Sequence, residues 1–94
     1  MNAAIQHVNL RVYGIVQGVC FRAATRDQAR ELGISGFARN EPDGSVYVEA
    51  EGPATALQEF CDWCRHGPPM ARVERVEEEP GTVMKYKGFG IRFG

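Results

Sequence analysis

The sequence has little excess charge of either sign and no apolar run long enough to cross a membrane. Its 94 residues carry 11 Lys and Arg against 12 Asp and Glu, a formal net charge of −1. Domains that bind nucleic acid carry a strong positive balance, so this composition argues against a nucleic-acid partner. The lack of a long apolar run argues against a membrane partner, and the first ten residues do not have the pattern of a secretion leader.

Cysteine is also scarce. The chain has three cysteines, and an odd number argues against the disulfide framework of a small secreted domain. We therefore expect a reducing, cytoplasmic location. Residues 1–94 contain no internal repeat or low-complexity segment, and this length can bury a modest core without a metal or a disulfide. The sequence thus predicts a single domain, and we expect it to be a monomer.

Apolar residues recur first at the spacing of a strand and then at the spacing of a helix. Apolar and polar side chains alternate over residues 8–13, which predicts a half-buried strand that ends at Gly14. Helical spacing follows over about residues 21–33, where Gly33 is placed to end the helix.

Two further strands are predicted as a hairpin. "SGFARN" (35–40) and "SVYVEAEG" (45–52) flank Pro42, Asp43 and Gly44, which have the chemistry of a turn. In the second strand we expect the side chains to alternate between the two faces, with Val46, Val48 and Ala50 facing inward and Tyr47, Glu49 and Glu51 facing out.

A second helix is predicted between Pro53 and Gly67. The segment 71–79 reads as an irregular strand with a bulge or a change of face, because its two valines are an odd number of residues apart. The last residues alternate again and predict a short strand, in which Phe89, Ile91 and Phe93 are expected to face the core.

This order of elements predicts an α+β fold. We expect a ferredoxin-like split βαββαβ sandwich, with the four main strands in an antiparallel sheet, both helices packed on one face and a short extra C-terminal strand. The predicted first strand then lies next to the strand of Asn40, or one strand away from it. The loop after Tyr13 could therefore approach the end of that strand.

The stretch "VYGIVQGVCFRAATR" (12–26) places a glycine-containing loop between the first strand and the first helix. Such a loop directs several backbone N–H groups to one point, and the helix N-terminus adds partial positive charge, so phosphate-like anions bind there. Gly14 and Gly18 allow tight turns. Arg22, in the first turn of the helix, can reach back over the loop with a two-pronged guanidinium.

The order of residues in this loop is specific. "GIVQGVCFR" (14–22) resembles the G-x-V-Q-G-V-x-F-R signature of the acylphosphatase family, with Cys20 at the variable position. "GISGFARNEPDGSV" (33–46) is similar to the second motif of the family, G-x-x-G-x-x-x-N-x-x-D-G-x-V. The two motifs lie at the family spacing, and the resemblance extends over essentially the entire chain.

The resemblance implies an enzyme that hydrolyses acyl phosphates to a carboxylate and inorganic phosphate, with inorganic phosphate as a competitive inhibitor and with no metal or cofactor. It implies two catalytic residues: Arg22 holds the phosphoryl oxygens, and Asn40 binds and orients the attacking water. The phosphate is implied to be held by Arg22 together with the backbone amides of residues 15–21, namely Ile15, Val16, Gln17, Gly18, Val19, Cys20 and Phe21.

Elementary chemistry agrees with these roles. An acyl phosphate has a good leaving group, so its hydrolysis needs positioning and charge stabilisation more than a strong nucleophile. Asn40 has no titratable group and cannot act as a base. A phosphate oxygen of the substrate is therefore the implied proton acceptor, and no covalent phosphoenzyme is expected.

Two alternative functional hypotheses rest on other residues. Cys20 and Arg26 have the C-x5-R spacing of cysteine-dependent phosphatases, although residues 21–25 have helical spacing and no glycine to cradle a phosphate. "KGFGIRF" (87–93) resembles a damaged RNA-binding motif, which leaves a non-catalytic, ferredoxin-like module for an anion or RNA as the alternative function. Its position on the last strand and the net charge argue against RNA binding.

The remaining Cys and His residues have simpler interpretations. Cys61 and Cys64 have C-x-x-C spacing, which suggests redox or zinc chemistry, but they fall late in the second helix on its apolar stripe, which favours core packing. His7 and His66 have no evident catalytic partner, and we expect each at the surface or at a helix end.

Overall fold

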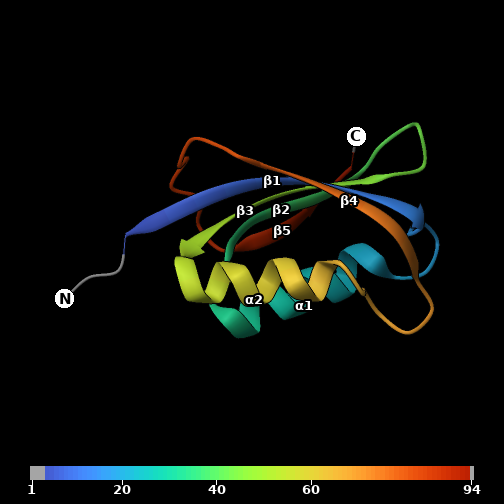
Figure 1. Cartoon of the computed structure of the whole chain (residues 1–94), viewed down its shortest axis with the longest axis horizontal. Helices are drawn as coiled ribbons and strands as arrows, with labels where there is room; N and C mark the ends of the chain where they lie inside the picture. The colour runs from blue at the N-terminus through green and yellow to red at the C-terminus, as the bar shows by residue number, and fades with distance from the viewer. Residues whose placement is uncertain (1–3, 94) are drawn as a thin grey trace.

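The computed structural model describes residues 4–93, so residues 1–3 and 94 of the expected domain lie outside the described part. The strands form one sheet in the order β4-β1-β3-β2-β5, and both helices cover the same face of it (Figure 1). The elements are β1 (Ile5–Ile15), α1 (Phe21–Leu32), β2 (Ser35–Asn40), β3 (Val46–Pro53), α2 (Ala54–Cys64), β4 (Arg72–Pro80) and β5 (Phe89–Arg92). The predicted ferredoxin-like fold is confirmed, and β1 and β2 are separated by β3 alone.

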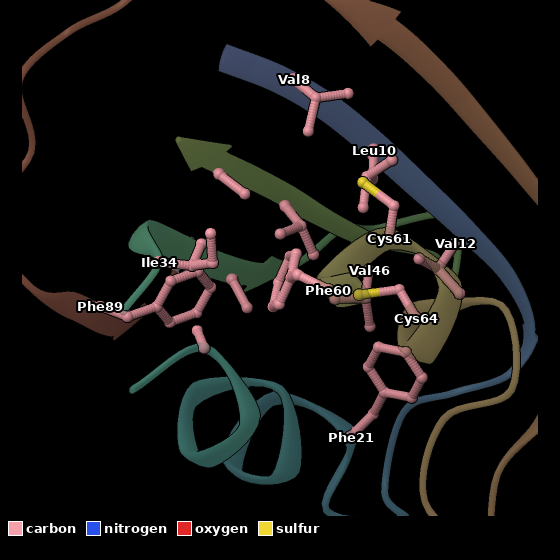
Figure 2. Close-up of a cluster of buried hydrophobic side chains, with 14 of the residues drawn as sticks. Val8, Leu10, Val12, Phe21, Ile34, Val46, Phe60, Cys61, Cys64 and Phe89 are labelled. Carbon is pink, nitrogen blue, oxygen red and sulfur yellow. The ribbon is translucent and has the colours of Figure 1, made fainter. Parts of the chain in front are cut away.

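The core lies between the sheet and the two helices (Figure 2). Strand alternation turns every second residue of β1 and β3 toward the helices, as the sequence predicts. The side chains that fill this layer from the strands and helices include Val8, Leu10, Val12, Val46, Val48, Ala50, Phe21, Ala29, Leu57, Phe60, Cys61 and Cys64.

The predicted irregularity of β4 is a bulge against β1. Tyr13 pairs with Arg75 and Gly14 pairs with Val73, so the extra residue is Glu74. Gly14 has a φ of 131°, and a Cβ there would overlap the carbonyl oxygen of Arg72. Only glycine permits this close approach of β1 and β4, and the strand continues one residue past Gly14, to Ile15.

β5 pairs with β2 in parallel, at the edge of the sheet. The sequence indicated an extra strand without its direction. Because β1 and β2 both run antiparallel to β3, the strands β1, β2 and β5 all point the same way. Their carboxyl ends therefore meet at one edge of the molecule, and α1 begins at that edge.

Two expectations about exposure are wrong, those for His7 and Phe93, and Glu51 is buried although it faces outward as expected. Glu51 and His7 are 4% and 6% exposed, although Glu51 faces away from the helices. The reason is that the β4–β5 connection lies over the outer face of the sheet, and the backbone amides of Met84 and Tyr86 donate hydrogen bonds to the Glu51 carboxylate. Phe93, expected in the core, is 83% exposed because β5 ends before it.

Neither helix within residues 4–93 is long and apolar enough to cross a membrane.

Candidate functional site

A pocket of about 330 Å³ opens where the strand ends meet the start of α1. The loop between β1 and α1, the first turn of α1, the end of β2 and the end of β5 form its walls. Its lining residues are Val16, Gly18, Cys20, Phe21, Arg22, Ala23, Asn40, Ile91 and Phe93.

The loop before α1 turns its backbone through two left-handed residues. Gly18 has a φ of 75° and Cys20 a φ of 62°. Cys20 is the N-cap residue of α1 but makes no side-chain capping hydrogen bond, and the first turn contains no acidic residue. The first backbone hydrogen bond of the helix runs from the Ala24 amide to the Cys20 carbonyl. The amides of residues 16–23, between the end of β1 and Ala24, are therefore available to an anion. The helix dipole also favours an anion at this position.

Arg22 projects from the first turn of α1 into the pocket. Within residues 4–93 it takes part in none of the ion pairs or side-chain hydrogen bonds. Its guanidinium carbon lies 4.9 Å from the centroid of the Phe93 ring. The positive charge is thus placed beside the free amides, and no carboxylate among residues 4–93 pairs with it.

Asn40 is the last residue of β2, where it pairs with Val46 of β3. Strand alternation puts it on the same face as Ala38, toward α1. Its Oδ1 is the one buried side-chain oxygen or nitrogen among residues 4–93 that has no hydrogen-bond partner. A buried acceptor without a donor costs about 1–3 kcal/mol, so this atom is suited to accept a hydrogen bond from a bound molecule such as water.

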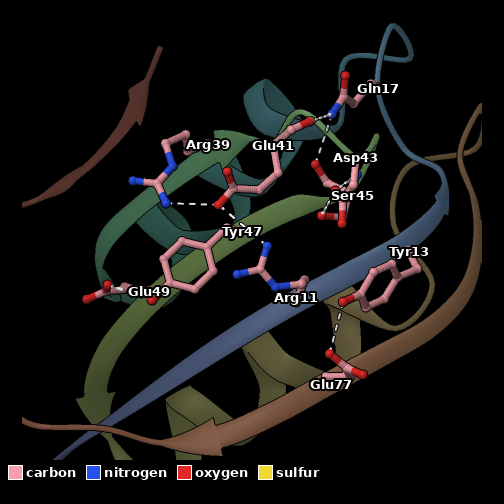
Figure 3. A network of polar contacts seen from close by, with 10 residues as sticks. All are labelled: Arg11, Tyr13, Gln17, Arg39, Glu41, Asp43, Ser45, Tyr47, Glu49 and Glu77. Atoms are coloured by element: carbon pink, nitrogen blue, oxygen red, sulfur yellow. Dashed lines mark hydrogen bonds and ion pairs between the residues drawn. The ribbon is translucent and has the colours of Figure 1, made fainter. Parts of the chain in front are cut away.

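Gln17 connects the loop to the β2–β3 hairpin (Figure 3). Its Nε2 donates to the carbonyl oxygens of Glu41 and Ser45, at 2.8 Å and 2.9 Å. The hairpin is itself closed by the Asp43 carboxylate, which accepts a 2.9 Å bond from the Ser45 amide. Hydrogen bonds from Ser45 lower the pKa of Asp43 below its usual value. The Gln17 side chain thus holds the anion loop against the segment that carries Asn40, and the sequence analysis missed this contact.

The outer face of the sheet supports the same hairpin with charged pairs. The Glu41 carboxylate lies 2.9 Å from Arg39 and 3.5 Å from Arg11. Both guanidinium groups also lie over the ring of Tyr47. Burial, and then a hydrogen bond to Glu49, raise the pKa of Tyr47 to about 12. This network faces away from the pocket and fixes the strands that lead to it.

The structure brings most of the predicted site residues together and leaves three at its margin. Arg22, Asn40, Val16, Gly18, Cys20 and Phe21 all line the pocket. Of the others, Ile15 belongs to β1 with its side chain exposed, Gln17 turns to the hairpin, and Val19 packs against the core. The sequence did not point to Ala23, in the first turn of α1, as a pocket residue. It did not point to Ile91 or Phe93 either, because their place depends on how β5 pairs.

The alternative sites are not supported by the geometry. Residues 21–25, between Cys20 and Arg26, are helical and form no cradle. Cys61 and Cys64 are buried on α2, and burial raises the pKa of Cys61 to about 12 and that of Cys64 well above its ordinary value, so neither is a ready thiolate. His66 contacts the Asp62 carbonyl near the end of α2, in line with the expected helix-end position.

The family model and the relatives of known name point to one family. Residues 8–91 match the family model described as Acylphosphatase. A protein named Acylphosphatase from Mannheimia succiniciproducens is 58% identical over 67 residues, which is 71% of this chain and 74% of that protein. Another of the same name from Rubrobacter xylanophilus is 50% identical over 96 residues, covering 98% of this chain and 86% of that protein. The solved acylphosphatase of Coxiella burnetii superposes with a TM-score of 0.90 at 34% identity, covering 94% of this chain and 93% of that one.

Proposed function

The chain belongs to the acylphosphatase family, and we propose that it hydrolyses acyl phosphates in the pocket at the start of α1, with Arg22 and Asn40 as its catalytic residues. The family and the activity rest on the comparisons. The roles of the residues rest on the arrangement of the pocket. The observation that carries these roles is the buried Oδ1 of Asn40, which has no hydrogen-bond partner among residues 4–93. It lines the same pocket as Arg22, which forms no ion pair with any described residue.

The phosphoryl group binds at the loop. Backbone amides of residues 15–21 donate hydrogen bonds to its oxygens, and Arg22 adds a two-pronged, charged contact. These donors are free because Cys20 makes no side-chain cap, and the left-handed turns at Gly18 and Cys20 hold them in place before the substrate binds. They stabilise the negative charge that the phosphoryl oxygens carry in the transition state.

Water attacks from the position next to Asn40. The Oδ1 atom accepts a hydrogen bond from the water and directs an oxygen lone pair at phosphorus. The new bond joins the water oxygen to phosphorus, and the bond between phosphorus and the acyl oxygen breaks, so a carboxylate leaves. One proton of the water passes to a phosphate oxygen of the substrate, because Asn40 cannot accept it. The products are a carboxylate and inorganic phosphate.

Several finer properties belong to the same proposal. Inorganic phosphate, as a product, binds at the loop and competes with the substrate. Residues 1–94 act as one domain and as a monomer, since a single copy already supplies a pocket that contains both Arg22 and Asn40. A cytoplasmic location suits the three cysteines, which are free thiols. The partner is a small molecule, with no nucleic acid, membrane, metal or cofactor required.

The test separates binding from turnover. In an assay with benzoyl phosphate, Asn40→Ala should lower kcat by about 10²- to 10³-fold, the cost of removing a group that orients the transition state. The inhibition constant of inorganic phosphate should stay within about 2-fold, because the amides and Arg22 remain. Activity should persist in a chelator.

An undiminished kcat in Asn40→Ala would contradict the proposed role of this residue. If neither the wild-type chain nor the variant turned over benzoyl phosphate while both bound inorganic phosphate, the alternative of a non-catalytic anion-binding module would replace the enzyme.

A further inference from the structure

The guanidinium of Arg22 differs from most other arginine side chains of this protein in the kind of group that it contacts. Within residues 4–93, most arginines pair with a carboxylate, and some of these also lie over an aromatic ring. Arg22, like Arg92, contacts an aromatic ring and forms no ion pair with any of these residues. The arginines that lie within ion-pair distance of an acidic side chain are Arg11, Arg26, Arg39, Arg65 and Arg75.

The ring in question belongs to Phe93, which is 83% exposed. A large apolar side chain is normally stabilised by burial. Packing in the core therefore does not explain why Phe93 lies at the rim of the pocket. Phe89, on the same side of β5, is 3% exposed and lies in the core. The apolar side of β5 thus leads from the core to the pocket, and Phe93, directly after the strand, meets Arg22.

The position of Phe93 follows from the pairing of β5. Arg92 is level with Arg39 in the parallel register of β5 and β2. Phe93 is the next residue along, just beyond the end of β5, and it lines the same pocket as Asn40. The ring lines the pocket together with the two groups that we assign to catalysis, and its contact with Arg22 joins α1 to the end of β5.

We propose that Phe93 is a positioning residue for Arg22, which it holds in the pocket through a cation–π contact; the inference rests on the proposed role of Arg22 in phosphate binding. An aromatic face attracts the guanidinium but does not accept hydrogen bonds from the N–H groups that point outward in the plane of the guanidinium. A carboxylate would occupy those donors and cancel the charge. The ring thus restricts the motion of the side chain while its phosphate-binding edge stays free, which lowers the ordering cost of binding.

The experiment compares Phe93→Leu with Phe93→Tyr. Leucine keeps apolar bulk without a π face, and tyrosine keeps the ring. We expect Phe93→Leu to raise the inhibition constant of inorganic phosphate and the KM of acetyl phosphate by about 2- to 5-fold, the range for an exposed cation–π contact. We expect kcat within about 2-fold and wild-type values for Phe93→Tyr. Because Phe93 is exposed, the thermal unfolding midpoint should be unchanged.

A second arm uses Arg22→Ala, in which the ring has no guanidinium to hold. Phosphate affinity, measured by calorimetric titration at high protein concentration, should then be the same whether or not Phe93→Leu is combined with Arg22→Ala. An equal effect of Phe93→Leu in both backgrounds would overturn the inference. So would an effect confined to benzoyl phosphate, with acetyl phosphate and inorganic phosphate unchanged, since that result would assign the ring to the acyl group.

The same variants separate this inference from the proposed function. If Arg22→Ala abolishes turnover while Phe93→Leu changes nothing, only the role of Phe93 fails. If Arg22→Ala keeps wild-type phosphate binding and turnover, the proposed function of Arg22 fails and the inference fails with it.

Discussion

The two ends of β1 carry polar clusters that differ in how completely their hydrogen bonds are satisfied. Near the start of the strand, His7 Nδ1 lies 2.7 Å from the Glu51 carboxylate and Nε2 lies 2.8 Å from Asn9 Oδ1. The same carboxylate accepts hydrogen bonds from the amides of Met84 and Tyr86. Beyond the other end of β1, the loop amides, Arg22 and the Oδ1 of Asn40 lack such partners within residues 4–93.

We assign the fully hydrogen-bonded cluster at the start of β1 to stability and the unpaired groups beyond its other end to function. A buried polar group costs free energy unless it is paired, so the His7–Glu51 cluster, fully paired, stabilises the fold and fastens the β4–β5 connection to the sheet. Unpaired groups gathered in one pocket destabilise the free protein and are satisfied by a ligand. This contrast makes opposite predictions for substitutions at the two ends.

The largest effect is expected at the unpaired end. Arg22→Ala should lower kcat/KM for benzoyl phosphate by about 10³-fold or more, as the loss of an arginine does in other phosphoryl transfers. Its urea midpoint should stay near wild type, because Arg22 forms no ion pair within the described residues. Arg26→Ala, one turn further along α1 and paired with Asp27, is the matched control and should keep full activity. Loss of activity in both variants would favour the cysteine-phosphatase alternative.

The next effect is expected at the paired end. Glu51→Gln should lower the free energy of unfolding by about 3 kcal/mol, because it leaves buried His7 without its carboxylate. The value comes from urea unfolding followed by circular dichroism. At temperatures where the variant is folded, its kcat/KM should match wild type. A large loss of activity in the folded variant would show that the two ends are coupled.

The same cluster predicts a pH dependence of stability. Burial alone raises the pKa of Glu51, but hydrogen bonds from His7 and from the amides of Met84 and Tyr86 outweigh it, so the pKa is lowered. A carboxyl whose folded pKa is depressed adds stability above its unfolded pKa, near about 4.3, and loses it as the pH falls through the folded value. The urea midpoint should therefore decline below about pH 4.3, and more steeply in wild type than in Glu51→Gln.

A smaller effect is expected for the contact that links the loop to the hairpin. Gln17→Met keeps the length of the side chain but removes both hydrogen bonds to the Glu41 and Ser45 carbonyls. We expect kcat/KM to fall by roughly 10-fold, since two hydrogen bonds of about 1 kcal/mol hold the loop against Asn40. Gln58→Met, exposed on α2, is the matched control. Unchanged kinetics in Gln17→Met would mean that the loop is positioned without this contact.

The smallest effect is expected for Cys20→Ser. The side chain lines the pocket, but the proposed mechanism uses only its backbone amide, so kcat/KM should change by less than about 3-fold. A loss of several hundred-fold would instead identify a thiolate nucleophile. Serine retains a similar size at this left-handed position, so the comparison is not confounded by a change of volume.

Much of the site could be predicted from residues close together in the chain. The "GIVQGVCFR" motif indicated the anion loop and Arg22, and "GFARN" indicated a strand that ends at Asn40. The structure brings Arg22 and Asn40 into one pocket. Phe93, Ile91 and the side-chain role of Gln17 escaped prediction, because each depends on contacts with segments more than 20 residues away.

The sequence by itself determined the elements and many of their ends, since alternation, helical spacing and left-handed glycines act over a few neighbouring residues. Such local rules account for three predicted features: the end of α1 at Gly33, the hairpin turn at 42–44 and the bulge of β4. Only the tertiary structure decided the direction of β5, the burial of His7 and Glu51 beneath the 81–88 connection, and the contact of Phe93 with Arg22. These features arise from strand pairing and from chain crossing over the sheet, whose free energy is shared among distant residues and leaves no local pattern.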